Sequence, residues 1–319
     1  MNFPYNNLIK VLLMAIPLLT LTSCNKNKQT GANSLLWKVS KDGKESYIFG
    51  TVHLPSKQFE KIPAEVSDAI KSTDICLNEI EPDEKNQLEI AKGMRLSDEK
   101  NLNDIIGTDR FSKLAKIVTN YTPPISQNYL NRVKIWAALL FISYPKKGYD
   151  LSMDILLYQH AVMLGKRTEG LETATQQLSA LESFTTEEQI QILDDAIAEA
   201  ENGYPTVSKI IKAYVSQNLD EMVSLFSDKE KDLPEQLKEK YLNKMLIERN
   251  LIFKDSILKY TNEGSVFAAV GAGHIIGDGN LLQLLENEGF VVEPVEFKFP
   301  GQNDLSDIQG LNFLNLDKF

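Results

Sequence analysis

The stretch SYIFGTVH at residues 46–53 sets the expected fold of this 319-residue chain. An apolar, strand-like run ends in Gly50, and His53 follows three residues later. The stretch VFAAVGAGH at residues 266–274 also ends in a Gly-x-x-His phrase, closed by His274. A buried strand that ends in glycine and then presents an imidazole at its carboxyl edge is how open α/β sheets display reactive groups. Because the chain has only three histidines, two of them in one setting indicate a site.

Strand-forming sequence stands near both ends of the chain. Two apolar runs flank Asp42 and Gly43, and this predicts a β-hairpin, because Asp-Gly is typical of tight two-residue turns. Further strands alternate with segments in which apolar residues have helical spacing. The predicted elements are strands at 35–40, 46–49, 75–81, 266–270 and 291–297, and helices at 63–71 and 279–288.

The middle of the chain, from about residue 83 to about 260, has mostly helical periodicity. A turn and a short strand at 165–172 interrupt it. We therefore predict an α/β fold with a central mixed sheet formed by the N- and C-terminal halves and a large helical insertion at about 83–260. This domain would span 35–299, and an irregular tail would follow at 300–319.

The first 24 residues resemble the export signal of a bacterial lipoprotein. Lys10 precedes an apolar run that is too short to span a bilayer, and LTSC at 21–24 resembles a lipobox. We predict a signal peptide at 1–23, lipid modification of Cys24 and a polar tether at 24–34. The alternative is an ordinary cleaved signal. The asparagine after the cysteine favours the outer membrane of the bacterial cell envelope as the location of the anchored protein.

Composition limits the partners that the chain would have. Its 44 acidic and 34 basic residues give a net charge of −10, which argues against nucleic acid as a partner. We expect contact with a membrane only through the anchor at Cys24. If Cys24 is acylated, Cys76 has no partner for a disulfide, and we expect it to be a small core residue. Nothing in the sequence specifies an oligomeric state.

A carboxylate is expected beside the two histidines. Glu79 lies on the strand after the first helix, so a simple β-α-β connection brings it to the same sheet edge as His53. Two imidazoles and a carboxylate match the ligand set of catalytic zinc and also suit manganese, iron or cobalt. Glu81 or Glu172 could orient a histidine or take a proton from water. The alternative is that these side chains form only structural hydrogen bonds.

The chain resembles the TraB/GumN family, which is related to the Tiki-type metalloproteases and more distantly to erythromycin esterases and the haem-linked ChaN proteins. The resemblance extends over residues 35–297 and follows the family's order. The matching phrases are LWKV at 36–39, YIFGTVHL at 47–54, NEIE at 78–81, GK at 165–166, GLET at 170–173, ERN at 248–250 and VGAGH at 270–274.

The resemblance implies roles for particular residues. The family's proposed active-site positions correspond to His53, Glu79 and His274. Arg249 falls on a family arginine suited to contact a substrate carboxylate or an oxyanion, and the alternative is a salt bridge that caps its helix. Asp154 and Glu172 fall on acidic positions of the family. Glu81 stands where many relatives have aspartate, so its side chain is one methylene longer.

The resemblance also implies an activity. We expect a lipid-anchored, metal-dependent hydrolase, specifically a peptidase that uses metal-activated water, with manganese, cobalt or zinc held by His53, Glu79 and His274. Its substrate would be a peptide or another small molecule. Two alternatives remain open: a non-catalytic lipoprotein of the same fold that binds or sequesters peptides, and a metal-independent esterase in which His53 and Glu79 act as base and acid.

Overall fold

The computed structural model describes residues 34–54, 61–121, 123–143, 152–229 and 233–300. The predicted signal peptide, Cys24, nearly all of the predicted tether and all but the first residue of the predicted tail lie outside these ranges. Those features therefore stay predictions. Within the described ranges, no helix has the length and the apolar content needed to cross a bilayer.

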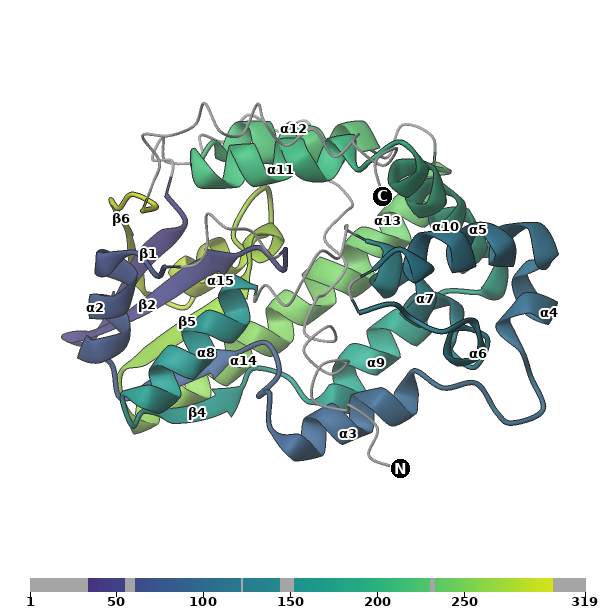
Figure 1. The fold of residues 1–319 in the computed structure, drawn as a ribbon. Coiled ribbons are helices and arrows are strands. Elements are labelled where there is room, and N and C mark those ends of the chain that lie inside the picture. The colour runs from purple at the N-terminus through teal and green to yellow at the C-terminus, as the bar shows by residue number, and fades with distance from the viewer. Residues whose placement is uncertain (1–33, 55–60, 122, 144–151, 230–232, 301–319) are drawn as a thin grey trace.

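A six-stranded mixed sheet forms the centre of one half of the molecule, with the strand order β4-β3-β5-β2-β1-β6 (Figure 1). The strands are β1 (Leu36–Lys41), β2 (Lys44–Thr51), β3 (Ile75–Asn78), β4 (Arg167–Gly170), β5 (Val266–Gly271) and β6 (Val291–Val295). Strands β4, β3, β5 and β2 are parallel, and β1 is antiparallel to both of its neighbours. Because β5 from the end of the chain lies between β2 and β3 from its start, the predicted mixed α/β sheet is confirmed.

The turns between the first strands follow from local sequence. Asp42 and Gly43 have φ values of 52° and 76°, as a two-residue turn with left-handed central residues requires, so the predicted hairpin is confirmed. Strand β3 ends at Asn78, earlier than the pattern at 75–81 predicts. The chain then turns into the next helix, whose first turn is capped by the Asp83 side chain, and the intervening Pro82 has no N–H for a strand ladder.

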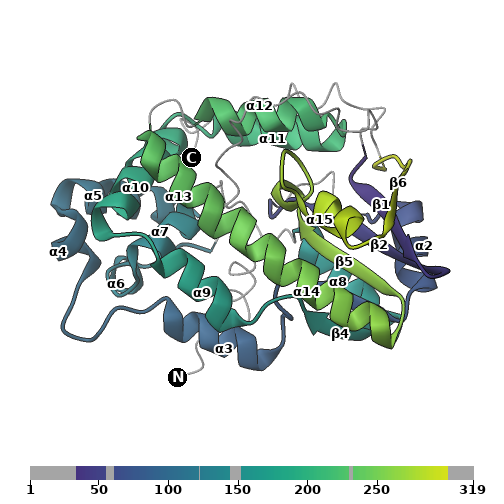
Figure 2. The ribbon, with the colours of Figure 1, turned by 180° about the vertical axis from the view of Figure 1, so that it is seen from behind.

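Within the described ranges, six helices share a hydrophobic core with the sheet, and together they form the sheet lobe. They are α2 (Ala64–Ser72), α8 (Met153–Met163), α11 (Pro205–Val215), α12 (Leu219–Lys229), α14 (Glu248–Glu263) and α15 (Leu281–Asn287). Helices α2 and α8 lie on the side of the sheet seen in Figure 1, and α14 and α15 lie on the side seen in Figure 2. Cys76 is buried in this core, as predicted.

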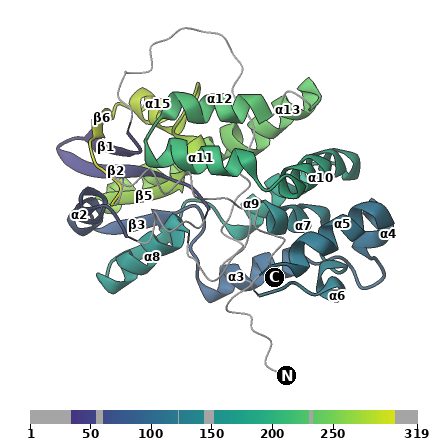
Figure 3. The same ribbon diagram turned by 45° about the horizontal axis from the view of Figure 1, so that its top comes forward.

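The other α-helices of the described part of the chain build a second hydrophobic core beside the sheet lobe, and we call them the helical lobe (Figure 3). They are α3 (Glu84–Gly93), α4 (Leu102–Ile106), α5 (Thr108–Thr119), α6 (Gln127–Leu130), α7 (Ile135–Ile142), α9 (Ala174–Glu182), α10 (Thr186–Glu201) and α13 (Glu235–Leu242). Every residue of α7 is buried, so this apolar helix is the centre of the lobe.

One continuous helical element connects the two lobes. Helix α13 packs in the helical lobe through Leu237 and Tyr241, while α14 packs against the sheet through Phe253 and Ile257. Between them lies η3 (Asn243–Ile247), a π-helical turn. Figure 2 shows this element running from one lobe to the other. Residues near the start of α14 therefore lie where the lobes meet.

Candidate active site at the carboxyl edge of the sheet

The four parallel strands end at one edge of the sheet, and a polar side chain follows each of them. In the register of the sheet, Thr51 pairs with Gly271, and Asn78 pairs with both Ala269 and Gly170. Strands β3 and β4 therefore end level with Ala269, two residues before the end of β5, and the residues that follow the four strands meet at this edge. These residues are His53 after β2, Glu79 after β3, Glu172 after β4 and His274 after β5, the last in the short 3-10 turn η4 (Ala272–His274).

Two glycines make room at this edge. A Cβ atom at Gly50 would lie 2.5 Å from the Cδ1 atom of Ile275 and 3.3 Å from the Cα atom of Ala272, so glycine lets the two Gly-x-x-His loops pack closely without displacing Ile275. A Cβ atom at Gly271 would lie 3.1 Å from His53 Nε2, 3.2 Å from Glu79 Oε1 and 3.7 Å from His274 Cδ2. Gly271 therefore leaves open a space that all three predicted active-site side chains border.

His53 is held by a carboxylate on each side. Its Nδ1 lies 2.8 Å from Asp154 Oδ2, and its Nε2 lies 3.5 Å from Glu79 Oε1. Asp154 also accepts a hydrogen bond from the Thr51 hydroxyl group. Burial lowers the pKa of His53, but the negative charges of Asp154 and Glu79 outweigh burial and raise the pKa to about 10.

His274 has a different environment. Its Nδ1 lies 2.7 Å from Asn250 Oδ1, and its Nε2 lies 3.3 Å from Arg249 Nη1 and 3.7 Å from Glu79 Oε1. The Phe253 ring packs against the imidazole, with 4.7 Å between the ring centroids. Burial and the positive charge of Arg249 lower the pKa of His274 to about 3. His274 is therefore a neutral ring at physiological pH.

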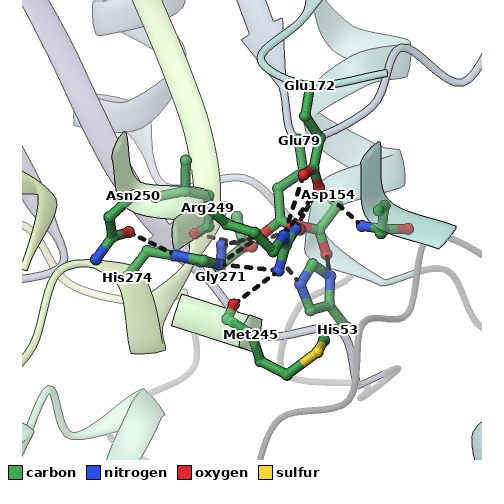
Figure 4. A network of polar contacts seen from close by, with 12 residues as sticks. His53, Glu79, Asp154, Glu172, Met245, Arg249, Asn250, Gly271 and His274 are labelled. Atoms are coloured by element: carbon green, nitrogen blue, oxygen red, sulfur yellow. Dashed lines mark hydrogen bonds and ion pairs between the residues drawn. The ribbon is translucent and has the colours of Figure 1, made fainter. Parts of the chain in front are cut away.

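Arg249 is bound entirely within the protein (Figure 4). Its Nη2 donates to Glu79 Oε2 at 2.7 Å and to Glu172 Oε1 at 2.5 Å, and its Nε donates to Glu172 at 3.0 Å. Its Nη1 donates to the Met245 carbonyl oxygen at 3.1 Å and faces His274 Nε2. These contacts use all the donors of the guanidinium group. The side chain is 3% exposed, so Arg249 joins the site residues to one another.

The two carboxylates that share Arg249 differ in their electrostatics. Burial raises the pKa of Glu79, but the charges of Arg249 and His53 outweigh it and hold the pKa well below the ordinary value. Glu79 Oε1 also accepts from the Gly271 amide at 2.7 Å. For Glu172, burial outweighs the attraction of Arg249 and raises the pKa. Glu79 is therefore an ionised group that both histidines and the guanidinium face.

The structure brings together six of the seven side chains predicted for the site: His53, Glu79, Asp154, Glu172, Arg249 and His274. Glu81 is the exception, because its carboxylate accepts from the Thr168 hydroxyl group at 2.8 Å and takes no part in the contacts described above. Strand pairing ends at Asn78, so the alternation that would point Glu79 and Glu81 to one face does not apply.

Sequence reasoning gave no role to Thr51, which donates to Asp154, nor to Asn250 and Gln177. Asn250 Oδ1 lies 2.7 Å from Nδ1 of His274, and Gln177 Nε2 donates to Glu172 at 3.2 Å. A signal for Asn250 was present, because it follows Arg249 in the ERN phrase of the family and a buried amide on a helix needs a partner.

The two imidazoles and the Glu79 carboxylate are chemical groups that commonly bind divalent metal ions. Each imidazole is held through Nδ1, by Asp154 or by Asn250, so that its Nε2 faces Glu79 Oε1. This is the arrangement in which proteins hold histidine ligands of a metal ion, and the space at Gly271 borders all three groups. Among the described residues, no group of three or more His, Cys, Asp or Glu side chains is arranged so that it could hold a metal ion without rearrangement.

Comparison with known proteins extends the description. The model of the TraB/PrgY/gumN family matches residues 35–294. The chain is 22% identical to metalloprotease TIKI1 of Xenopus tropicalis, over 85% of this chain and 63% of that protein. It is 22% identical to metalloprotease TIKI1 of Homo sapiens, over 84% and 63%. It is 23% identical to metalloprotease TIKI2 of Danio rerio, over 85% and 62%. The matches thus span less than two thirds of these relatives, and no solved structure matches the chain.

Proposed function

This chain belongs to the TraB/PrgY/gumN family, and from that premise we propose that it is a metal-dependent hydrolase that cleaves peptides. One observation carries the proposal: His53, Glu79 and His274 come from opposite ends of the chain, and both histidine Nε2 atoms lie within 4 Å of one Glu79 oxygen. The names of the similar proteins, all metalloproteases, support the choice of reaction.

In this proposal His53 and His274 would hold the ion through Nε2 and Glu79 through its carboxylate. A divalent cation such as manganese, cobalt or zinc, when bound, would supply the Lewis acidity that polarises a scissile carbonyl group and makes water a better nucleophile. Asp154 would keep the Nδ1 proton of His53 in place and thereby direct Nε2 toward Glu79.

Arg249 and Glu172 would hold the site together. A buried carboxylate such as Glu79 is costly without a positive partner, and Arg249 supplies one at 2.7 Å. Glu172 in turn binds Arg249 through Nε and Nη2, which fixes the plane of the guanidinium group. We therefore assign Arg249 a positioning role, because its donors are already used inside the protein.

The test combines metal analysis with a cleavage assay. Purified protein should bind a divalent ion, and cleavage of a peptide library should stop with chelator and in the His274→Ala variant. The matched control is His160→Ala, because His160 bonds the Ser67 hydroxyl group on α2 and takes no part in the cluster. Peptide binding without turnover would contradict the proposal and support a sequestering protein. Ester hydrolysis that resists chelator would contradict it in favour of a metal-independent esterase.

We also propose that the protein is anchored to the bacterial cell envelope, at the outer membrane, through a lipid on Cys24. The apolar run before the lipobox-like LTSC supports this proposal. Cells that express the chain should incorporate labelled palmitate into it, and Cys24→Ser should abolish the label and release the protein from the membrane fraction. Equal labelling of the variant would rule out Cys24 as the site. Cys76→Ser is the matched control for loss of a cysteine elsewhere.

A further inference from the structure

The side chain of Asn250 lies between two partners that fix its orientation. It is 2% exposed, with Oδ1 at 2.7 Å from His274 Nδ1 and Nδ2 at 3.4 Å from the Gly279 carbonyl oxygen. A carbonyl oxygen can only accept a hydrogen bond, so the amide nitrogen must face Gly279. The amide oxygen must then face the ring of His274.

The same reasoning fixes the proton of the ring. The Asn250 oxygen can only accept, so His274 Nδ1 must carry the hydrogen. On the other side of the ring, Arg249 Nη1 can only donate, so Nε2 must be the acceptor and carry none. Two neighbouring residues of α14 thus contact the two nitrogens of one ring and require the same tautomer.

We propose that Asn250 is a positioning residue that fixes His274 in the tautomer with the proton on Nδ1, so that Nε2 stays unprotonated where it lies 3.3 Å from Arg249 Nη1 and 3.7 Å from Glu79 Oε1. An amide achieves this without adding charge. The site already contains the carboxylates of Asp154, Glu79 and Glu172, and a further buried carboxylate would have no positive partner of its own. The consequence for metal affinity rests on the proposed function, whereas the tautomer does not.

Nuclear magnetic resonance can test the tautomer directly. The metal-free full-length chain, labelled with ¹⁵N in histidine, has only three imidazoles to assign, and long-range ¹H–¹⁵N correlations distinguish a protonated from an unprotonated ring nitrogen. We expect a protonated Nδ1 and an unprotonated Nε2 for His274. A proton on Nε2 of His274 would overturn the proposal, even if the protein proved to be a metallopeptidase.

Two substitutions separate positioning from simple packing. Asn250→Leu removes the acceptor, so we expect a mixture of tautomers and about 10- to 100-fold weaker binding of Zn²⁺ or Mn²⁺. Asn250→Asp keeps an acceptor at the same place, so we expect Nδ1 of His274 to stay protonated in this variant. The matched control is Asn243→Leu at an exposed position on the same helical element, which should change neither the tautomer nor the affinity.

The possible outcomes are distinct. If Asn250→Leu keeps a single Nδ1 tautomer, Asn250 does not set it and the proposal fails. If Asn250→Leu does not fold, the wild-type spectrum and the Asn250→Asp variant decide the question. If the wild-type protein binds no metal ion, the proposed function fails, while the tautomer still supports or refutes the role of Asn250.

Discussion

The two Gly-x-x-His loops share a sequence phrase and a place at the sheet edge, but they have opposite electrostatics. Nδ1 of His53 contacts the carboxylate of Asp154 on α8, whereas Nδ1 of His274 contacts the side-chain amide of Asn250 on α14. The pKa of His53 is about 10 and that of His274 about 3. The Gly-x-x-His sequence therefore places each ring at the sheet edge, whereas Asp154 on α8 and Arg249 on α14 determine which ring is charged.

This difference gives each ring its own task in the metal-free protein. His53 is a cation between two carboxylates and offsets their charge. His274 is a neutral ring whose Nε2 faces a guanidinium group. Arg249 contacts only the second ring directly, so it adds to the difference between the two environments, and it also holds Glu79 and Glu172.

Removal of Arg249 should therefore have the largest effect. Arg249→Met would leave Glu172 buried without a cation and Glu79 with His53 alone, and we expect a loss of about 3–5 kcal/mol in the free energy of unfolding. Urea denaturation of the metal-free protein measures it. Arg110→Met, which breaks the exposed pair with Asp194, is the matched control and should cost about 0–1 kcal/mol. Equal losses would show that the buried guanidinium group is not needed to stabilise the carboxylates.

The space between the two rings is the next point to test. The backbone at Gly271, with φ −54° and ψ 137°, accepts alanine without strain. In Gly271→Ala the added methyl group would crowd His53 Nε2 and Glu79 Oε1. We therefore expect the affinity for Zn²⁺ to fall at least about 100-fold, which exceeds the effect of losing one residue that contacts Nδ1 of a histidine. Titration calorimetry measures this affinity.

Gly273→Ala provides the control, since its Cβ atom would meet only Leu246 at 3.4 Å, an ordinary contact. If both alanine variants bind the ion as the wild type does, the ion does not lie at Gly271.

Asp154→Asn would give both rings an amide partner and so remove much of the difference between the loops. The carboxylate of Asp154 makes the largest contribution that raises the pKa of His53, so we expect that pKa to fall by about 1–3 pH units from about 10. Histidine resonances followed through a pH titration of the metal-free protein measure it. An unchanged pKa would mean that Glu79, rather than Asp154, holds the proton on His53.

The same shift has a consequence for stability. The folded-state pKa of His53 lies above its ordinary value of 6.5, so its contribution is fully present below pH 6.5 and is lost as pH rises toward about 10. The metal-free wild type should lose stability across this window, and Asp154→Asn should lose less.

The strands and the two histidines could be predicted from the sequence because local patterns specify them. Apolar runs that end in glycine mark β2 and β5, and parallel pairing then brings His53 and His274 to one edge. Glu79 followed from a simple β-α-β connection. These predictions need only strand periodicity and the direction of the chain.

The partners of the rings could not be predicted in the same way. Asp154 is 101 residues from His53 in sequence, and Arg249 is 170 residues from Glu79, so no local pattern reports these contacts. Asn250 stands in the family phrase ERN, but its role could not be predicted, because it depends on which face of α14 lies against His274. Glu81 was placed wrongly because strand pairing ends earlier than the polarity pattern indicates.

The smallest effect expected is an absence of titration at His274. Its folded-state pKa of about 3 lies below the ordinary value of 6.5, so its ring signals should not change between pH 5 and 9 in the metal-free protein. Below pH 6.5, His274 binds a proton in the unfolded chain but not in the folded protein. This residue should therefore lower the free energy of unfolding as the pH drops toward 3. His160, which is partly exposed, is the internal control: burial lowers its pKa below 6.5, so its ring signals should change on the acid side of that value in the same titration. A His274 signal that titrates near pH 6.5 would mean that neither burial nor Arg249 suppresses its charge, and the contrast between the two loops would then rest on His53 alone.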